Sequence, residues 1–371
     1  MNDFGNTFKD KVVLITGNTG FKGSWLSLWM IELGAKVVGV SNNVPTQPSN
    51  YQVCQIEEKI TQEFIDITDF KKVQHAFEKW KPDFVFHMAA QALVKESYSD
   101  PLETFKVNGL GTANVLEALR NIDKEVTAII ITSDKAYDNV EWIWGYRESD
   151  RIGGKDPYSA SKGVAELVIR SYVDSFFTVQ DCNVRLGIVR AGNVIGGGDW
   201  ADDRIVPDCM KAWSLGDLVD IRSPNATRPW QHVLEPLSGY ISLASELSQG
   251  PHLHGEAYNF GPSADQNFSV RELIDEMTKH WDSVVWNDTS GDLSVERVYE
   301  AGLLKLNCDK ALAQLLWEPT MTFEETVKLT VEWYKAFYQK DRTDIHEFTL
   351  NQIRFYMALA KERQLKWAAG G

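Results

Sequence analysis

The chain has 371 residues, of which 43% are hydrophobic and 24% are charged. These shares are typical of a globular protein and exclude a disordered, collagen-like or disulfide-scaffold chain. The 38 Lys and Arg residues against 52 Asp and Glu residues give a formal net charge of −14. Because no basic cluster is present, we expect neither a nucleic-acid partner nor an anionic membrane partner. This length predicts two domains, or one large unit with an added lobe.

The four cysteines share no metal-ligand spacing, so we expect free thiols, a reducing compartment and no metal site. They are Cys54, Cys182, Cys209 and Cys308. The first residues lack the apolar segment of a signal peptide, and no stretch reaches the ~18 apolar residues of a membrane span. We therefore expect a soluble, cytoplasmic protein.

Short apolar segments alternate with helical patterns through the first half of the chain. Strands are expected at 11–16, 36–40, 84–87, 126–132 and 183–190, and helices at 21–33, 69–80, 101–121 and 156–177. Apolar runs without alternation are typical of parallel strands that are covered on both faces. The repeated strand–helix units predict an α/β fold of the Rossmann type, with a doubly wound parallel sheet.

Beyond about residue 190 the pattern changes, and strand-like pieces become short. Three capping-box patterns predict helix starts at Ser269-x-x-Glu272, Thr322-x-x-Glu325 and Thr349-x-x-Gln352. We expect residues 1–190 to form a dinucleotide-binding domain that carries the catalytic residues. Residues 191–371 would form a smaller α/β substrate lobe with a helical tail at about 349–367. The chain is expected to cross between these lobes more than once.

A glycine cluster, TGNTGFKG at 16–23, lies between the first predicted strand and the first predicted helix. Gly17 can make a tight turn, Gly20 lets the backbone approach a pyrophosphate, and Gly23 allows close helix–strand packing. The free N–H groups of the helix N-terminus would then face the phosphates. In this position the triplet predicts dinucleotide binding.

The end of the second strand, Val40-Ser41-Asn42, carries no acid for an adenosine ribose and no Arg for a 2′-phosphate. The choice between NAD and NADP therefore stays open at this point. Asp66 and Ile67 follow the third strand and are a plausible adenine contact, although a solvated acid at a strand end is an equal alternative.

Ser133 follows the apolar strand at 126–132, and Tyr158-x-x-x-Lys162 lies on a predicted helix. The spacing of four places the phenol and the ammonium on one helix face. The cation would lower the pKa of the phenol and could hold a nicotinamide ribose. Tyr158 would then be a base for a hydroxyl proton during hydride transfer, and Ser133 would bind the same substrate oxygen.

These motifs resemble the extended short-chain dehydrogenases/reductases that modify sugar nucleotides, and most closely their 4,6-dehydratases that act on CDP-glucose. The resemblance spans nearly the whole chain. The matching segments are 16–29, 86–94, 132–148, 156–168, 190–208, 228–240 and 258–262. The part around Trp142 and Trp144 is the most discriminating.

The resemblance implies NAD as cofactor and a reaction in which NAD⁺ is regenerated. A hydride would leave C4 of the hexose, water would be eliminated across C5 and C6, and the hydride would return to C6. Asp134 would protonate the leaving O6, which requires a raised pKa. Lys135 would act at C5, either as a neutral base or as a cation that stabilises the enolate.

The resemblance also implies two sets of contacts, in addition to the catalytic group Ser133, Asp134, Lys135, Tyr158 and Lys162. The cofactor set is Gly17, Thr19, Gly20, Phe21, Gly23, Asp66, Ile67, Ala89 and Ala90, together with Tyr158 and Lys162. The substrate set is Gln91, Lys95, Asn193, Arg204, Arg228 and Asn259. Arg228 would hold the diphosphate, whereas Asn193 and Asn259 have turn capping as their alternative.

Related enzymes further imply a homo-oligomer, a dimer or a tetramer, that packs through the helices at 101–121 and 156–177. Three alternatives remain for the function. A dehydratase could prefer dTDP-, UDP- or GDP-sugars, and a 4-epimerase would need Ser133, Tyr158 and Lys162 without Asp134 and Lys135. A non-catalytic dinucleotide sensor would be expected to have lost the Tyr or the Lys.

Overall fold

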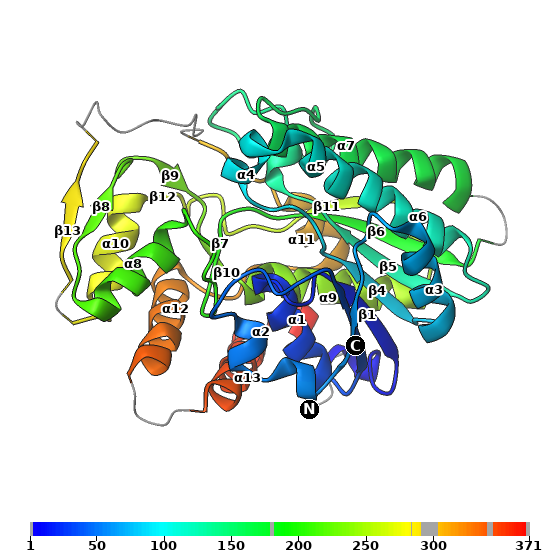
Figure 1. The fold of residues 1–371 in the computed structure, drawn as a ribbon, viewed down its shortest axis with the longest axis horizontal. Helices are drawn as coiled ribbons and strands as arrows, with labels where there is room; N and C mark the ends of the chain where they lie inside the picture. The colour runs from blue at the N-terminus through cyan, green and yellow to red at the C-terminus, as the bar shows by residue number, and fades with distance from the viewer. Residues whose placement is uncertain (1–2, 179–181, 283, 291–302, 340–343, 369–371) are drawn as a thin grey trace.

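A seven-stranded, fully parallel sheet forms the centre of the computed structural model, which describes residues 3–178, 182–282, 284–290, 303–339 and 344–368 (Figure 1). The strand order is β11-β6-β5-β4-β1-β2-β3. The strands are β1 Val12–Thr16, β2 Lys36–Ser41, β3 Thr61–Phe64, β4 Phe84–His87, β5 Val126–Ile131, β6 Val184–Arg190 and β11 Ala257–Asn259. This order confirms the predicted Rossmann-type α/β fold.

Alternate residues of each central strand enter two different cores. In β1, Val13 and Ile15 pack on the side of α1 (Phe21–Glu32) and α9 (Leu234–Gln249), whereas Leu14 packs on the opposite side. Figure 1 shows helices on both faces of the sheet. The helices on the side of Leu14 are α3 Phe70–Trp80, α5 Pro101–Phe105, α6 Thr112–Arg120 and α7 Pro157–Tyr172. A strand that is buried on both faces has no polar side, which explains the unbroken apolar runs.

Two predicted helices contain π-helical turns. The helix expected at 101–121 is α5, a π-helical turn at Lys106–Gly111, and α6, and the helix expected at 156–177 is α7 followed by a π-helical turn at Val173–Phe177. Short helices α2 Asn50–Val53 and α4 Val94–Ser99 lie in the connections of this half of the chain.

The smaller lobe, at the left of Figure 1, holds three two-stranded ladders, β7–β10, β9–β12 and β8–β13. Their strands are β7 Val194–Ile195, β8 Val219–Ile221, β9 Thr227–Arg228, β10 Gln231–His232, β12 Phe268–Ser269 and β13 Trp286–Asp288. The remaining helices of this half are α8 Ile205–Leu215, α10 Val270–Thr278, α11 Asp309–Leu315, α12 Phe323–Tyr338 and α13 Ile345–Glu362. From this half of the chain, β11 returns to the central sheet, where it pairs with β6. The expected repeated crossing between lobes stays a prediction. The domain limits 1–190 and 191–371 stay a prediction.

Two of the three predicted capping boxes are confirmed, at Ser269 before α10 and at Thr322 before α12. The third was wrong. Thr349 lies inside α13, where its hydroxyl donates to the carbonyl of Ile345 (2.7 Å). Asp344 caps this helix instead, since its carboxylate accepts the N–H of Glu347. Because Asp344 already caps the helix upstream, the capping-box pattern at Thr349 does not mark a helix start.

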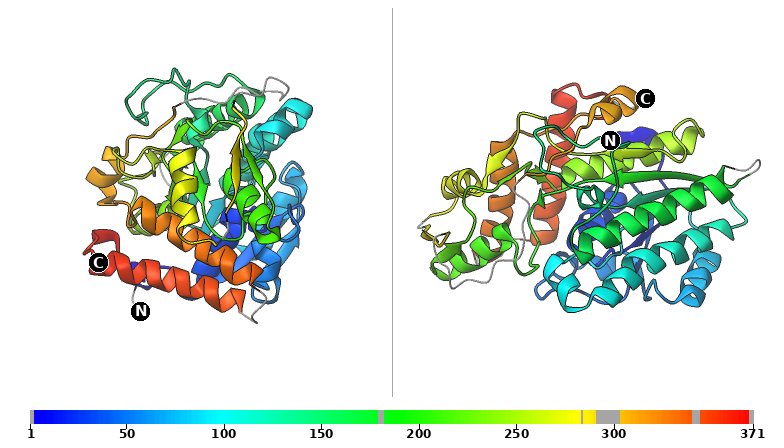
Figure 2. Two further views of the ribbon diagram at one scale, coloured as in Figure 1. Left: turned by 90° about the vertical axis from the view of Figure 1, so that its left-hand side faces the viewer. Right: turned by 90° about the horizontal axis from the view of Figure 1, so that it is seen from above.

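Both described ends of the chain meet beneath the sheet, where Phe4 stacks on Trp367 at 5.8 Å between ring centroids. Figure 2 shows the two termini near one another in both views. Across the described segments, no helix has the length and apolarity needed to cross a membrane.

Candidate active site

The glycine loop after β1 is shaped by backbone contacts that exclude side chains. Gly17 has a φ of +72°, and a Cβ there would lie 2.7 Å from the nitrogen of Ala89. A Cβ on Gly23 would lie 2.1 Å from the carbonyl oxygen of Gly17, whereas one on Gly20 would have 3.4 Å to its nearest neighbour. Gly17 and Gly23 therefore maintain the turn and the packing, and Gly20 leaves space in front of α1.

The N-terminus of α1 suits a pyrophosphate. Gly20 caps the helix without any side-chain hydrogen bond, and the first turn holds no acidic residue. Unpaired N–H groups and the positive end of the helix dipole favour an anion at this position. These features fit a dinucleotide at the loop.

Side chains below the loop attach it to the ends of β2 and β3. The Ser41 hydroxyl donates to Asn18 Oδ1 (2.8 Å), and Asn18 Nδ2 donates to Gln62 Oε1 (2.6 Å). The Thr19 hydroxyl donates to the carbonyl of Asn43 (2.7 Å). Ser41, at the end of β2 where no carboxylate is present, is therefore a buried residue that supports the loop.

The other predicted cofactor residues lie at the carboxyl ends of neighbouring strands. Half-buried Asp66 accepts the N–H of Thr68 (2.8 Å), and Ile67 is buried under the π-helical turn before α6. The N–H of Ala89 donates to Thr16 Oγ1 (3.1 Å), beside the loop. The fold thus brings these residues to one edge of the sheet, and their contact with a cofactor stays a prediction, as does that of Phe21 and Ala90.

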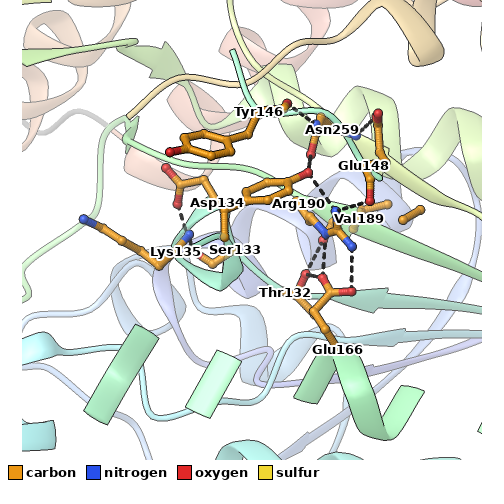
Figure 3. A network of polar contacts seen from close by, with 12 residues as sticks. Thr132, Ser133, Asp134, Lys135, Tyr146, Glu148, Glu166, Val189, Arg190 and Asn259 are labelled. Carbon is orange, nitrogen blue, oxygen red and sulfur yellow. Dashed lines mark hydrogen bonds and ion pairs between the residues drawn. The ribbon is translucent and has the colours of Figure 1, made fainter. Parts of the chain in front are cut away.

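The segment Thr132–Tyr137, here called the catalytic strip, follows β5 and carries three of the predicted catalytic groups. The Ser133 hydroxyl donates to Asp134 Oδ1 (2.9 Å) and accepts the N–H of Lys135 (3.2 Å). A Cβ on Gly192 would lie 1.9 Å from Asp134 Oδ2, so only glycine permits this position of the carboxyl group. Figure 3 shows the strip next to the buried network that supports it.

Asp134 has the electrostatic character that an acid requires. Its side chain is buried, and burial raises its pKa, against the opposing effects of Lys135, Ser133 and Lys22. The pKa of this carboxyl group is therefore shifted in the direction predicted for it.

Tyr158 and Lys162 lie in the first turns of α7, which Asp156 caps and which begins at Pro157. The Lys162 Nζ atom is 6.0 Å from the centroid of the Tyr158 ring. Burial raises the pKa of Tyr158 to about 12, although a hydrogen bond with Ser133 lowers it. The pKa shift is therefore opposite to the expected lowering, because removal from water disfavours the phenolate more than Ser133 and Arg204 favour it.

Lys22 is a further charged residue of this group, and the sequence analysis gave it no role. It lies in the first turn of α1, where burial and the charge of Arg204 lower its pKa to about 8 while Asp134 raises it. Burial and the charge of Lys22 similarly lower the pKa of Lys162 to about 8. The sequence signal that could have identified Lys22 is its position between Gly20 and Gly23, because the first turn of this helix faces the site.

A small cavity opens beside Asp134. Its walls are Gly192, Pro229, Gln231, the segment 261–266 without Asp265, Lys305 and Leu306. Several of these residues come from loops that are remote in the sequence and carry no motif, so sequence reasoning missed them. The missed wall residues are 263, 264, 266, 305 and 306, which lie outside the segments that carry the resemblance.

Three predicted substrate residues are already engaged with protein groups. Arg204 directly precedes α8, and its Nη1 atom lies 2.7 Å from Asp199 Oδ2. Lys95 of α4 pairs with Asp203 (3.1 Å) across the two lobes. The Gln91 side chain bonds the backbone of Leu93 in both directions, at 2.9 and 2.7 Å.

The surroundings of Arg228, Asn193 and Asn259 also suit a structural role. Arg228 is buried in β9 and donates to the carbonyl of Thr227 (2.8 Å). Asn193 has a φ of +46°, and its carbonyl accepts the N–H of Gln231. Asn259 is fully buried, and protein groups bond both its amide oxygen and its amide nitrogen. The geometry favours the structural alternative for both asparagines, and all three substrate contacts stay predictions.

Comparison with known proteins relates this geometry to sugar-nucleotide enzymes. A family model described as GDP-mannose 4,6 dehydratase matches residues 14–330. The CDP-glucose 4,6-dehydratase of Salmonella typhimurium is 45% identical over 336 residues, which cover 90% of this chain and 92% of that protein. The dTDP-glucose 4,6-dehydratase of Haemophilus influenzae is 24% identical and covers 87% of this chain and 97% of its own length.

Among solved structures, the UDP-glucose 4-epimerase of Stenotrophomonas maltophila, with bound NAD and formylated UDP-arabinopyranose, matches with a TM-score of 0.76. It is 21% identical and covers 89% of this chain and 99% of that chain. At this identity the likeness concerns the fold alone.

Proposed function

The chain belongs to the GDP-mannose 4,6 dehydratase family, and on that premise we propose that it converts CDP-glucose to CDP-4-keto-6-deoxyglucose. The observation that carries this proposal is the buried Asp134 with Lys135 beside it, next to Ser133, Tyr158 and Lys162. An acid–base pair in this position serves an elimination, which a 4-epimerase does not need. The 45% identity to a CDP-glucose 4,6-dehydratase supports the choice of nucleotide.

NAD is the proposed cofactor, and the residues of the glycine loop fit it. The space in front of Gly20 and the uncapped N-terminus of α1 suit its pyrophosphate. Lys162 would hold the nicotinamide ribose. The chemistry that bound NAD supplies is storage of a hydride, taken from C4 of the hexose and returned to C6.

The first step requires removal of the proton of the C4 hydroxyl as the hydride leaves C4. Tyr158 would accept that proton, and Ser133 would donate a hydrogen bond to the same oxygen. Because burial raises the pKa of Tyr158 to about 12, the phenol needs positive charge beside it when it acts as a base. The ammonium of Lys162 supplies such a charge within the same helix.

The second step breaks the C5–H and C6–O bonds. The C5 proton is acidic because it lies α to the new ketone, and Lys135 would take it as a neutral base or stabilise the enolate as a cation. Asp134 would give its proton to the leaving O6, so that water departs. Lys22 and Lys135 would stabilise the resulting carboxylate, since the charge of each opposes the raised pKa of Asp134. A proton then returns to C5 as the hydride reaches C6.

Incubation with NAD⁺ and each of CDP-, dTDP-, UDP- and GDP-glucose, followed by mass spectrometry, tests the reaction and the nucleotide together. We expect loss of water from CDP-glucose. Intact mass with every donor contradicts the dehydratase, and dehydration of only another donor contradicts the cytidine assignment. An epimerase would yield an isomer of unchanged mass, detected by chromatography.

We also propose a homodimer through α5 and α7. Leu102 of α5, Leu110 of the π-helical turn and Leu167 of α7 are exposed over 82%, 52% and 65% of their surfaces, and α5 and α7 pack side by side. Exposed leucines on adjacent helices are typical of a surface that a partner covers. Sedimentation should give a dimer at micromolar concentration, and a Leu167→Glu variant should shift it to monomer. A monomeric wild type contradicts the proposal.

A further inference from the structure

A buried ion pair supports the catalytic strip, and the proposed reaction does not use it. Arg190, at the end of β6, binds Glu166 of α7 through two parallel contacts, Nε to Oε1 (2.7 Å) and Nη2 to Oε2 (2.9 Å) (Figure 3). Both side chains are only 5% exposed. A buried pair of this kind is stable only when its remaining polar atoms are also bonded. We call it the clamp pair.

Both ends of the strip are bonded to the clamp pair. At one end, the Thr132 hydroxyl donates to Glu166 Oε1 (2.5 Å). At the other end, Arg190 Nη1 donates to the Tyr137 hydroxyl (2.7 Å). Ser133, Asp134 and Lys135 lie between these two anchors. Glu166 is also one turn beyond Lys162 on α7, so the same ion pair links the strip to the helix of Tyr158.

Tyr137 extends this link to the wall of the cavity. Its hydroxyl donates to Asn259 Oδ1 (2.8 Å), and Asn259 Nδ2 donates to the carbonyl of Tyr146 (2.9 Å). The N–H of Tyr146 in turn donates to the carbonyl of Lys305 (2.9 Å), a residue of the cavity wall. The Tyr137 and Tyr146 rings stack at 5.1 Å. Burial raises the pKa of Tyr137, so its phenol keeps the proton that it donates.

We propose that Tyr137 is a positioning residue, which acts through the clamp pair to place Asp134 and Lys135 relative to Tyr158 and the cavity wall. This inference rests on the proposed function, because it concerns the elimination step. Tyr137 itself has no role in the chemistry: its hydroxyl is occupied by Arg190 and Asn259. Misplacement of an acid by about 1 Å can slow a reaction roughly 10²-fold, so a group that maintains the position of Asp134 affects rate more than binding.

The test compares Tyr137→Phe with Tyr172→Phe, a matched control that removes a phenol hydroxyl bonded to Glu117 at the far end of α7. We expect Tyr137→Phe to lower kcat for CDP-glucose roughly 10- to 100-fold and to change KM less than about threefold. Fluorescence of enzyme-bound NADH should rise during turnover, because C4 oxidation depends mainly on Tyr158 and Lys162, whereas elimination depends on Asp134 and Lys135 of the strip. Tyr172→Phe should match the wild type in all three measurements.

Thr132→Val tests the other anchor and remains informative if Tyr137→Phe does not fold. It keeps the side-chain shape, removes the bond to Glu166, and should also lower kcat and raise bound NADH. The double variant should lose less than the product of the two single losses, because both changes loosen the same ion pair.

A folded Tyr137→Phe variant with wild-type kcat and wild-type NADH fluorescence overturns the positioning role. The role is also overturned if the substitution lowers the unfolding temperature but leaves kcat and NADH fluorescence unchanged. If Thr132→Val folds and Tyr137→Phe does not, a wild-type kcat for Thr132→Val also overturns the positioning role. A wild-type chain that dehydrates no sugar nucleotide contradicts the proposed function instead, so the two failures are distinguishable.

Discussion

The proposed cofactor side and the proposed substrate side of the site are built in different ways. On the cofactor side, the glycine loop, Tyr158 and Lys162 belong to continuous strand–turn–helix segments, and backbone contacts shape the loop. On the substrate side, the cavity wall comes from loops around residues 229, 261 and 305, and side chains such as Asn259 join them. Substitutions on the first side should therefore act through backbone sterics and charge, and those on the second through lost side-chain bonds.

The largest expected effect is at the junction of the two sides, at Asp134. Asp134→Asn removes the proposed proton donor of the elimination and should lower kcat by about 10²- to 10³-fold. C4 oxidation should still occur, so bound NADH should accumulate in stopped-flow fluorescence. Asp208→Asn is the matched control, because burial and neighbouring acids raise the pKa of Asp208 to about 6 outside the cavity. Full turnover by Asp134→Asn would remove Asp134 from its role as the acid.

Two glycine substitutions separate the folding role of the loop from its binding role. Gly23→Ala places a Cβ 2.1 Å from the Gly17 carbonyl and should destabilise the protein by about 1–3 kcal/mol, measured by thermal unfolding. Gly20→Ala has 3.4 Å to its nearest neighbour, so its unfolding temperature should change little. Its added methyl group should weaken NAD binding roughly tenfold in calorimetry. Equal unfolding losses for both variants would contradict this division.

On the substrate side, Arg228→Lys tests the predicted diphosphate contact. A lysine cannot bind two phosphate oxygens in parallel, so KM for CDP-glucose should rise about tenfold with little change in kcat. Arg222→Lys, the same change at an exposed residue of the same lobe, should leave KM unchanged. An unaltered KM for Arg228→Lys together with a lower unfolding temperature would make Arg228 a structural residue.

The smallest effect is a pH dependence of stability at Glu235, which joins α9 to α13. Its carboxyl group accepts the N–H of Met321 (2.7 Å) and the hydroxyl of Tyr356 (2.8 Å), and burial raises its pKa from 4.5 to about 7. A raised folded-state pKa contributes stability that is full below about pH 4.5 and is lost as the pH rises through about 7.

The comparison is therefore between the wild type and Glu235→Gln, which does not titrate. Between pH 5 and pH 8 the unfolding temperature of the wild type should fall by a few °C more than that of the variant. Calorimetric scans across this range measure the difference. Parallel curves would show that Glu235 has the same pKa in the folded and unfolded chains.

Much of the cofactor side was predictable from the sequence because its determinants are local. Apolar runs identified the parallel strands, and the spacing of Gly17, Gly20 and Gly23 predicted a loop that the backbone geometry explains. A glycine that must accept a positive φ or a carbonyl contact is recognisable from its neighbours. The position of Ser133 after a strand and the spacing of Tyr158 and Lys162 are local in the same sense.

Only the tertiary structure decided the remaining features, because burial and contacts between distant loops depend on the packing of the whole chain. Desolvation, and not the helical spacing to Lys162, sets the direction of the Tyr158 pKa. Long-range packing brings Lys22 into the electrostatic environment of Asp134, and it engages the Asn259 amide with protein groups. The sequence by itself determined the fold class and predicted which groups would react. Packing determined their neighbours and the direction of the pKa shifts of Asp134 and Tyr158, since removal from water is a property of the assembled molecule.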